Sequence, residues 1–177
     1  MNINIKPINI ENKNEINSYV KWENDLSLHH LTIPMRDKNS SKELVSIQSI
    51  VKSFRSNPDR AKNTFLIFDD TKPIGQISIH INPPHLYKKV EDTCWLGLTM
   101  GEKDYWGTGA AYEAMTLLED LMKVRDIKRI ELGVFEFNTR AQKFYTKLGY
   151  KKVGEVKDFT FWEGRFWNDI RMEKDLN

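Results

Sequence analysis

Alternating apolar and polar residues mark out strands along much of this chain. Residues 74–82 place isoleucine between polar neighbours, and residues 64–68 (TFLIF) precede them across the turn DDTKP. This pattern predicts a β-hairpin with one buried face, because successive side chains of a strand point to opposite faces. Residues 94–100 alternate again and predict a third strand of this meander, with Gly97 inside it. The other segments with strand character are residues 3–8, 129–135, 150–156 and 165–176.

Apolar residues at helical spacing predict four helices. These cover approximately residues 12–23, 40–55, 109–124 and 138–149. Ser40 heads a capping box (SSKE) at the start of the second helix, and Pro58 follows its end. Asn138 is a suitable cap for the fourth helix, which Gly149 ends.

The order of these elements predicts the fold class. Residues 22–40 show no periodicity, which predicts a long loop between the first two helices. Antiparallel strands come first, and the succession strand, helix, strand, helix, strand follows. We therefore expect an α/β (α+β) fold with a mixed, mostly antiparallel sheet flanked by helices. Because no linker or repeat interrupts the chain, we expect one domain over residues 1–177.

Composition narrows the possible partners rather than the fold. The 177 residues are 40% hydrophobic and 29% charged, which is ordinary for a globular domain with a substantial core. The formal net charge of +2 gives no global field that would select nucleic acid or an anionic membrane. The single cysteine, Cys94, rules out an internal disulfide and a cysteine-rich zinc site, and we expect a buried thiol. The polar start and the lack of a long apolar run predict a cytoplasmic protein.

Two glycines stand where the third strand leads into the third helix. In EKDYWGTGAAYEAM, Gly107 and Gly109 come directly before a run with helical character. The free N–H groups of a helix start favour an anion, and glycine lets a bulky diphosphate approach the main chain. A plain tight turn would also explain this pattern. Tyr112 replaces the third glycine of GxGxxG and no GK[ST] follows, so dinucleotide and nucleoside triphosphate sites fit poorly.

Three segments together resemble one known family. DYWGTGAAYEAM resembles the pyrophosphate-binding motif of the GNAT superfamily of acyl-CoA-dependent N-acyltransferases. RIELGVFEFNTRAQKFYTKLGYKKVGE is similar to a later motif of that superfamily, and EGRFWNDIRMEKDL resembles the closing strand of its ribosomal-protein N-terminal and spermidine acetyltransferase branch. The resemblance covers roughly Cys94 to the C-terminus. It implies acetyl transfer from acetyl-CoA to an amine without a metal, and a splayed parallel strand pair formed by residues 94–100 and 129–135.

The resemblance also implies roles for individual residues. Main-chain amides from Tyr105 to Ala110 would hold the pyrophosphate, and a backbone N–H near Leu98 would polarise the thioester carbonyl. Tyr145 matches the family's general acid, which protonates the departing thiolate; a core position beside Phe144 is the alternative. The implied cofactor-binding residues are Leu98, Met100, Tyr105, Trp106, Gly107, Thr108, Gly109, Ala110 and Asn138. Asp104 departs from the family, which often has Gln or Arg there.

The sequence leaves the proton-accepting base open. An alkylammonium, with a pKa of about 10, must lose a proton before it attacks a thioester. Relatives often carry Glu directly before the Leu/Ile-Gly pair of the strand, but this chain has Trp95 there. Side chains able to replace that Glu are His80, Glu91, Asp92 and Glu131, and a chain of waters is equally suitable. A domain that binds acyl-CoA without catalysis is therefore the alternative to an enzyme.

The acceptor implied by the resemblance is a small-molecule amine or a peptide N-terminus, and an aminoglycoside is also open. A polyamine needs carboxylates for its second cation. The acidic pairs available are Glu23 with Asp25 and Glu91 with Asp92. A peptide needs a groove, whose candidate aromatic residues are Trp95, Trp162 and Trp167. Residues 165–172 (RFWNDIRM) are a candidate for strand pairing across a homodimer.

Overall fold

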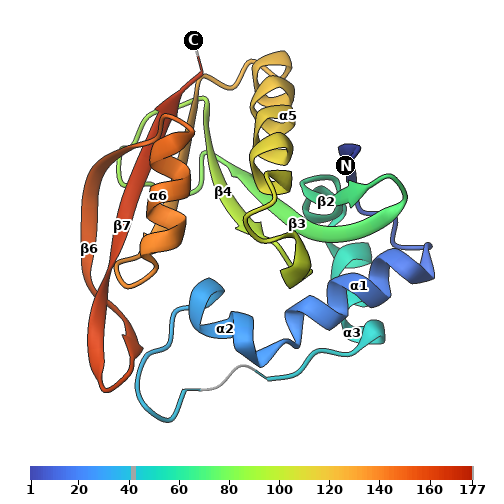
Figure 1. Cartoon of the computed structure of the whole chain (residues 1–177), viewed down its shortest axis with the longest axis horizontal. Coiled ribbons are helices and arrows are strands. Elements are labelled where there is room, and N and C mark those ends of the chain that lie inside the picture. Colours follow the sequence, from blue (N-terminus) through green and yellow to red (C-terminus); the bar gives the residue numbers. More distant parts are fainter. Residues whose placement is uncertain (41–42, 177) are drawn as a thin grey trace. The chain divides into compact units, whose positions relative to one another are not determined.

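The computed structural model describes residues 1–40 and 43–176 (Figure 1). The strands are β1 (Ile3–Pro7), β2 (Thr64–Asp69), β3 (Lys72–Ile81), β4 (Thr93–Thr99), β5 (Arg129–Phe135), β6 (Lys151–Trp162) and β7 (Arg165–Asp175). The helices are α1 (Lys13–Glu23), α2 (Leu26–Thr32), α3 (Ile47–Ser56), α4 (Pro58–Lys62), α5 (Ala110–Val124) and α6 (Thr139–Lys147), with a 3-10 turn η1 (Lys103–Tyr105). The strand order is β1-β2-β3-β4-β5-β7-β6, and the pair β4–β5 is parallel. The predicted mixed, mostly antiparallel α/β fold is confirmed.

The chain divides into two compact units. Unit 1 comprises Met1–Leu28, Glu43–Ile79 and Leu98–Leu121, and unit 2 comprises His29–Lys42, His80–Gly97 and Met122–Asn177. The expected single domain over residues 1–177 stays a prediction. None of the helices in the described residues is long and apolar enough to cross a membrane. Within the same residues, no group of three or more His, Cys, Asp or Glu side chains is arranged to hold a metal ion.

Unit 1 has a core in which α1 and α3 pack on strand β2. The Trp22 and Phe54 side chains are 2% and 1% exposed, and the Tyr19 ring meets Phe54 edge-on at 5.3 Å between centroids. The predicted hairpin of β2 and β3 is confirmed, with its turn at Asp70. However, β2 is buried along both faces rather than one, and β1 and β3 pair with its two edges. A strand with two neighbours and two covered faces shows no alternation of polarity.

Two sequence predictions around α2 and α3 were wrong. The predicted loop 22–40 contains α2, which starts where the Asp25 carboxylate accepts a hydrogen bond from the Ser27 N–H at 2.9 Å. The second predicted helix begins at Ile47 instead of Ser40, and Ser41 and Lys42 of its supposed capping box lie outside the described residues.

The physical reason for the late start of α3 is local. The Asn24 side-chain amide donates to the Val45 carbonyl at 2.9 Å and accepts from the Val45 N–H at 2.8 Å. This pair of bonds occupies both backbone groups of Val45, as a neighbouring strand would. Ser46 and Ser49 then form the capping box that starts α3.

Unit 2 is built on the strands β5, β7 and β6, and the long β6–β7 hairpin is seen in orange and red in Figure 1. The strand β5 and the helix α6 agree with their predicted positions, and the Asn138 side chain caps α6 by accepting from the Ala141 N–H at 3.1 Å. Strand β7 pairs with β5 on one side and with β6 on the other. Pairing with β5 covers only Asp169–Asp175, so residues 165–168 have β6 as their one strand neighbour among the described residues. The predicted homodimer contact through residues 165–172 stays a prediction.

Candidate functional site

The corner before α5 takes its shape from two glycines. Gly107 and Gly109 have φ angles of +78° and +97°, which only glycine adopts at little cost. A Cβ atom added at either position would meet no atom within 4 Å. The backbone therefore needs both glycines for its conformation, and the space above them is open.

The main-chain donors of this corner are only partly used. Four of the six predicted amide donors bond within the turn, at 2.9 to 3.4 Å: those of Tyr105, Trp106, Thr108 and Ala110. Among the residues that the structure describes, no hydrogen bond engages the N–H of Gly107 or Gly109. The Gly109 N–H directly precedes α5, a helix of 15 residues whose dipole favours negative charge at this end, and the Gly107 N–H lies two residues earlier. The corner thus presents two main-chain donors that an anionic group could use.

Helix α1 supports the segment that enters this corner. A Cβ atom on Gly101 would lie 2.3 Å from the Trp22 ring, so the chain passes directly over the indole. The Trp22 indole N–H also donates to the Glu102 carboxylate at 2.8 Å, and Lys21 forms an ion pair with the same oxygen at 2.6 Å. These contacts fix the start of the turn to the core of unit 1.

The two aromatic side chains of the corner serve the fold. The Tyr105 hydroxyl donates to the Asp69 carboxylate at 3.0 Å, and the Trp106 indole N–H donates to the Met100 carbonyl at 2.9 Å. Of these predicted cofactor-binding residues, the side chains of Tyr105 and Trp106 are therefore occupied, and one acceptor position of Met100 is used. Leu98, the second-last residue of β4, is half-buried.

In unit 2, α6 positions the predicted acid. The Tyr145 side chain is 7% exposed and packs edge-on against Phe144 and Tyr150, with ring centroids 5.1 and 5.6 Å away. Burial raises the pKa of the Tyr145 hydroxyl well above its usual value, so the group stays protonated at neutral pH. Asn138 is half-buried and its amide oxygen is engaged as the cap of α6.

Trp95, predicted to stand where relatives often carry a Glu that acts as base, packs against two side chains of unit 2. Its indole ring meets the His85 ring edge-on at 4.6 Å, and the Arg171 guanidinium lies 4.7 Å from its centre. This stack fills the position with an aromatic group that accepts no proton. Three of the predicted substitutes for the Glu are exposed: His80, Glu91 and Asp92. The predicted buried thiol of Cys94 is confirmed, and burial raises its pKa to about 12.

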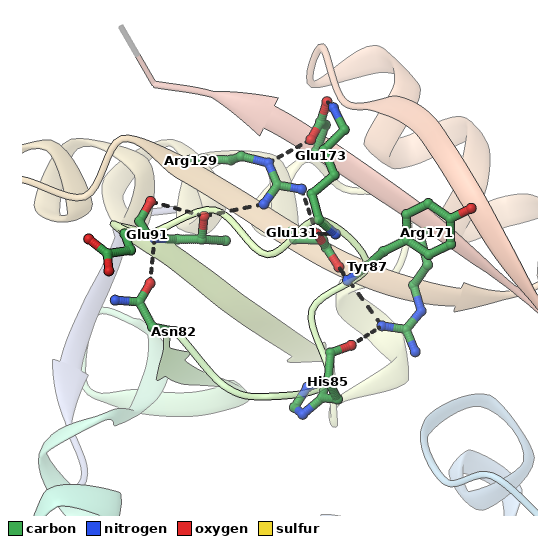
Figure 2. Close-up of polar contacts among 10 residues, drawn as sticks. Asn82, His85, Tyr87, Glu91, Arg129, Glu131, Arg171 and Glu173 are labelled. Atoms are coloured by element: carbon green, nitrogen blue, oxygen red, sulfur yellow. Dashed lines mark hydrogen bonds and ion pairs between the residues drawn. The ribbon is translucent and has the colours of Figure 1, made fainter.

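The fourth predicted substitute, Glu131, lies at the centre of a buried ion cluster (Figure 2). Its carboxylate is fully buried and accepts from Arg129 at 2.5 Å. The backbone N–H groups of Tyr87 and Lys88 donate to its two oxygens at 2.6 and 3.3 Å. Arg129 in turn binds Glu173 at 2.5 Å. With donors on both oxygens, Glu131 anchors the β3–β4 loop to β5 and is poorly suited to take a proton.

The other end of this cluster contains residues that the sequence prediction missed. Arg171 donates to the His85 carbonyl at 3.2 Å and lies 3.9 Å from Glu131 and 2.7 Å from the Asp169 carboxylate. Asp169 is 3% exposed, and burial raises its pKa to about 6 despite the neighbouring guanidinium. The available signal was the alternation of charges along two strands, at Arg129 and Glu131 and at Asp169, Arg171 and Glu173. Charged residues at every second position of a strand lie on the same face of the sheet.

Aromatic side chains gather elsewhere in unit 2, around Phe137. The rings of Trp162 and Trp167 lie 6.2 and 5.5 Å from the Phe137 ring, and His30 stacks on Trp162 at 4.4 Å. All four side chains are half-buried, and burial lowers the pKa of His30. Of the three predicted groove tryptophans, Trp162 and Trp167 come together in this aromatic cluster. Trp95 packs in the separate stack with His85 and Arg171.

The acidic pair predicted for a polyamine in unit 1 is already engaged. Glu23 accepts from the Gln76 side chain at 2.9 Å. Asp25 accepts from the Ser27 backbone and hydroxyl, and it pairs with Lys103 at 3.3 Å. Hydrogen bonds from Ser27 lower the pKa of Asp25. Both carboxylates therefore already have polar partners at the place where a second ammonium group of a polyamine would bind.

Comparison with known proteins gives a family match and a consistent set of folds. The model of the Acetyltransferase (GNAT) family matches residues 27–150. No curated protein matches the chain. A spermidine N-acetyltransferase that is a chimera from Vibrio cholerae and hSSAT is similar over 99% of this chain and 96% of that chain, at 16% identity and a TM-score of 0.77.

Two further solved structures have the same fold. The ribosomal-protein-alanine N-acetyltransferase from Brucella melitensis is similar over 97% of this chain and 99% of that chain, at 13% identity and a TM-score of 0.74. The yncA protein of Salmonella typhimurium, solved with its cofactor acetyl-CoA, covers 100% of this chain and 95% of its own, at 12% identity and a TM-score of 0.73. At these identities the likeness concerns the fold alone.

Proposed function

Because the chain belongs to the acetyltransferase (GNAT) family, we propose that it transfers an acetyl group from acetyl-CoA to a primary amine. The observation that carries this proposal is the glycine corner. Its open space and the two N–H groups of Gly107 and Gly109 at the start of α5 match the needs of a diphosphate. The acceptor would be a polyamine-like small molecule or a protein N-terminus, attacked directly while both substrates are bound.

The glycine corner would bind the cofactor mainly through the backbone. Gly107 and Gly109 would donate their N–H groups to the diphosphate, and Thr108 and Ala110 would line the same turn. The backbone of Leu98 and Met100 would bind the pantetheine arm, and the Leu98 N–H would polarise the carbonyl. Acetyl-CoA supplies the thioester on which the chemistry takes place. Asp104 stands where relatives often carry Gln or Arg. Its lack of a positive charge would weaken diphosphate binding only a little if main-chain N–H groups provide most of the donors.

Tyr145 would act as the acid. A thiolate leaves when the carbon–sulfur bond breaks, and it needs a proton. The burial that raises the pKa of Tyr145 also disfavours a charged thiolate in the same surroundings, so both groups shift in the same direction. Proton transfer from the hydroxyl to the sulfur therefore remains effective in a buried site.

The aromatic cluster favours an acceptor with an apolar body. A spermidine-like acceptor needs free carboxylates, whereas Glu23 and Asp25 are engaged in unit 1. The half-buried rings of Trp162, Trp167 and Phe137 offer apolar surface and attraction for a cation instead. We therefore favour a peptide N-terminus, or an amine that carries an apolar group, at this cluster; a polyamine would depend on the exposed pair Glu91 and Asp92 instead.

A non-catalytic acyl-CoA-binding domain is the second candidate. It is motivated by Trp95, which fills the position of the family's Glu and is fixed between His85 and Arg171. Such a domain would bind acetyl-CoA at the glycine corner and release no thiol in the presence of amines.

The test measures thiol release from acetyl-CoA with spermidine, phenethylamine and a short peptide as acceptors. Tyr145→Phe is expected to lower kcat about 10²-fold. Thr108→Glu, which adds a negative charge to the exposed corner, is expected to raise the KM for acetyl-CoA about tenfold with little change in kcat. Thr116→Glu, also exposed and within α5, is the matched control. Binding of acetyl-CoA without thiol release for any amine would support the second candidate instead.

A further inference from the structure

The carboxylate of Asp169 lies at a distinctive point of the parallel strand pair. Pairing of β4 with β5 runs from Thr93 and Arg129 to Leu96 and Leu132, and Gly97 and Gly133 come next on the two strands. A Cβ atom on Gly133 would lie 2.4 Å from the nearer Asp169 oxygen, so the carboxylate covers the glycine backbone. Only glycine at this position leaves room for Asp169.

Asp169 differs from the other buried carboxylate in how it is held. Glu131 has donors on both oxygens, from Arg129 and from two backbone N–H groups. Within residues 1–40 and 43–176, Asp169 forms one ion pair, with Arg171, which is shared with Glu131 and with the His85 carbonyl. The arginine lies 2.7 Å away as an ion pair. Asp169 is therefore a buried carboxylate whose ionised form is incompletely compensated.

The elements around Asp169 bring few other charges. Strand β5 presents Gly133 and Phe135, which are uncharged, and β6 pairs Val156 with Asp169. The flanking residues of β6, Glu155 and Lys157, form an ion pair with each other at 3.7 Å. The β3–β4 loop contributes the carbonyl and ring of His85, whose pKa is lowered by burial and then by Arg171. The balance at Asp169 is thus between burial and one guanidinium.

We propose that Asp169 is the general base that accepts the proton of the acceptor amine, an inference that rests on the proposed acetyl transfer. The ammonium group gives one proton to the Asp169 carboxylate, and the freed nitrogen attacks the thioester carbon. A carbon–nitrogen bond forms, the carbon–sulfur bond breaks, and the thiolate takes a proton from Tyr145. The nitrogen loses its second proton to restore Tyr145, and Asp169 releases its proton to water. The products are an amide, free coenzyme A and one proton.

The assignment also explains how the chain functions with Trp95. The candidates His80, Glu91 and Asp92 are exposed side chains, and both oxygens of Glu131 already accept hydrogen bonds. Asp169 is a carboxylate on β7, a strand that does not carry the family's Glu position. A base with a pKa of about 6 is ionised at neutral pH and still able to take up a proton during the reaction.

The experiment compares Asp169→Asn with the wild type in acetylation of spermidine, phenethylamine and a short peptide across pH 5 to 9. We expect the variant to lose at least 10²-fold in kcat/KM at pH 8 while binding acetyl-CoA normally. The ratio of wild-type to variant activity is expected to fall as the pH drops through about 6. Ionisation of the amine affects both proteins equally and cancels in this ratio. Asp175→Asn, the same change at an exposed position of β7, is the matched control.

Two further measurements keep the outcomes distinct. Asp169→Glu, which keeps a carboxylate, is expected to be more active than Asp169→Asn. If Asp169 only held Arg171 in place, no such recovery of activity would be expected. The acidic limb of the wild type is expected to stay at the same pH when a less basic amine replaces phenethylamine, because the limb belongs to the protein. Wild-type activity retained by Asp169→Asn, or a limb that moves with the amine, overturns the assignment alone. Absence of acetylation of every probe by the wild type overturns the proposed function with it.

Discussion

The glycine corner of unit 1 and the charged face of unit 2, which is the buried ion cluster of Arg129, Glu131, Asp169, Arg171 and Glu173, stabilise charge in opposite ways. The corner uses backbone N–H groups in an open, exposed turn, and its aromatic side chains point into supporting contacts. The charged face buries side chains of both signs against one another, with donors on both oxygens of Glu131 and a single guanidinium beside Asp169. Main-chain donors need only the correct φ angles, so the surrounding side chains are free to vary. Buried side-chain charges need every partner, so each member of the set restricts the others.

The largest expected effect tests this interdependence in unit 2. Glu131→Gln leaves Arg129 and the two loop N–H groups without their shared anion, and we expect it to lower the free energy of unfolding by about 3 kcal/mol. Glu11→Gln, which removes an exposed ion pair with Arg55, is expected to cost under about 1 kcal/mol. Chemical denaturation of both variants measures the difference. Equal losses would show that burial of the cluster contributes nothing.

A second test uses the pH dependence of stability. The folded pKa of Asp169, about 6, is raised above the ordinary 3.8, so protonation favours the folded state. This contribution is fully present below about pH 4 and is lost as the pH rises through about 6. The wild type should therefore gain up to about 3 kcal/mol over Asp169→Asn between pH 7 and pH 4. Denaturant unfolding at both pH values measures this, and parallel curves for the two proteins would contradict it.

The smallest expected effect concerns the corner. Gly109→Ala places a side chain at a φ of +97° in open space, which costs about 1–2 kcal/mol from backbone strain without a clash. Gly164→Ala in the β6–β7 turn, at a φ of +82° and also in open space, is the matched control. Both variants should lose similar thermal stability, and only Gly109→Ala should lose affinity for acetyl-CoA in calorimetry. Equal acetyl-CoA affinity in the two variants would show that the glycine corner does not bind the cofactor.

Elements with a complete local signal could be predicted from the sequence. Strand β5 alternates from Arg129 to Val134, and α6 carries its own cap at Asn138 and its own stop at Gly149, so both were predicted with nearly correct bounds. Helix α3 was placed too early because its start depends on Asn24, which is distant in sequence from Val45. A prediction from local sequence patterns cannot detect a contact between residues that are this far apart in the chain.

The candidate site divides along the same line. The glycine corner is a continuous stretch of sequence, so its motif could be found directly. Asp169 could not, because its environment depends on the insertion of β7 between β5 and β6 and on a glycine at position 133. Neither the strand order nor the burial of a carboxylate is visible in the alternation of residues along β7. The sequence shows that its charges share a face, but it does not show what that face meets.

The attachment of the β3–β4 loop to Glu131 has a consequence for motion. Tyr87 and Lys88 are exposed loop residues, yet their N–H groups end on a fully buried carboxylate. Opening this loop would strip Glu131 of two donors in a place that water does not reach, so small independent fluctuations of the loop are suppressed. The loop is then expected to move on the slow timescale of sheet opening rather than on the nanosecond timescale of a surface turn. The exposed β3–β4 loop is therefore expected to move on the same timescale as the sheet around Glu131.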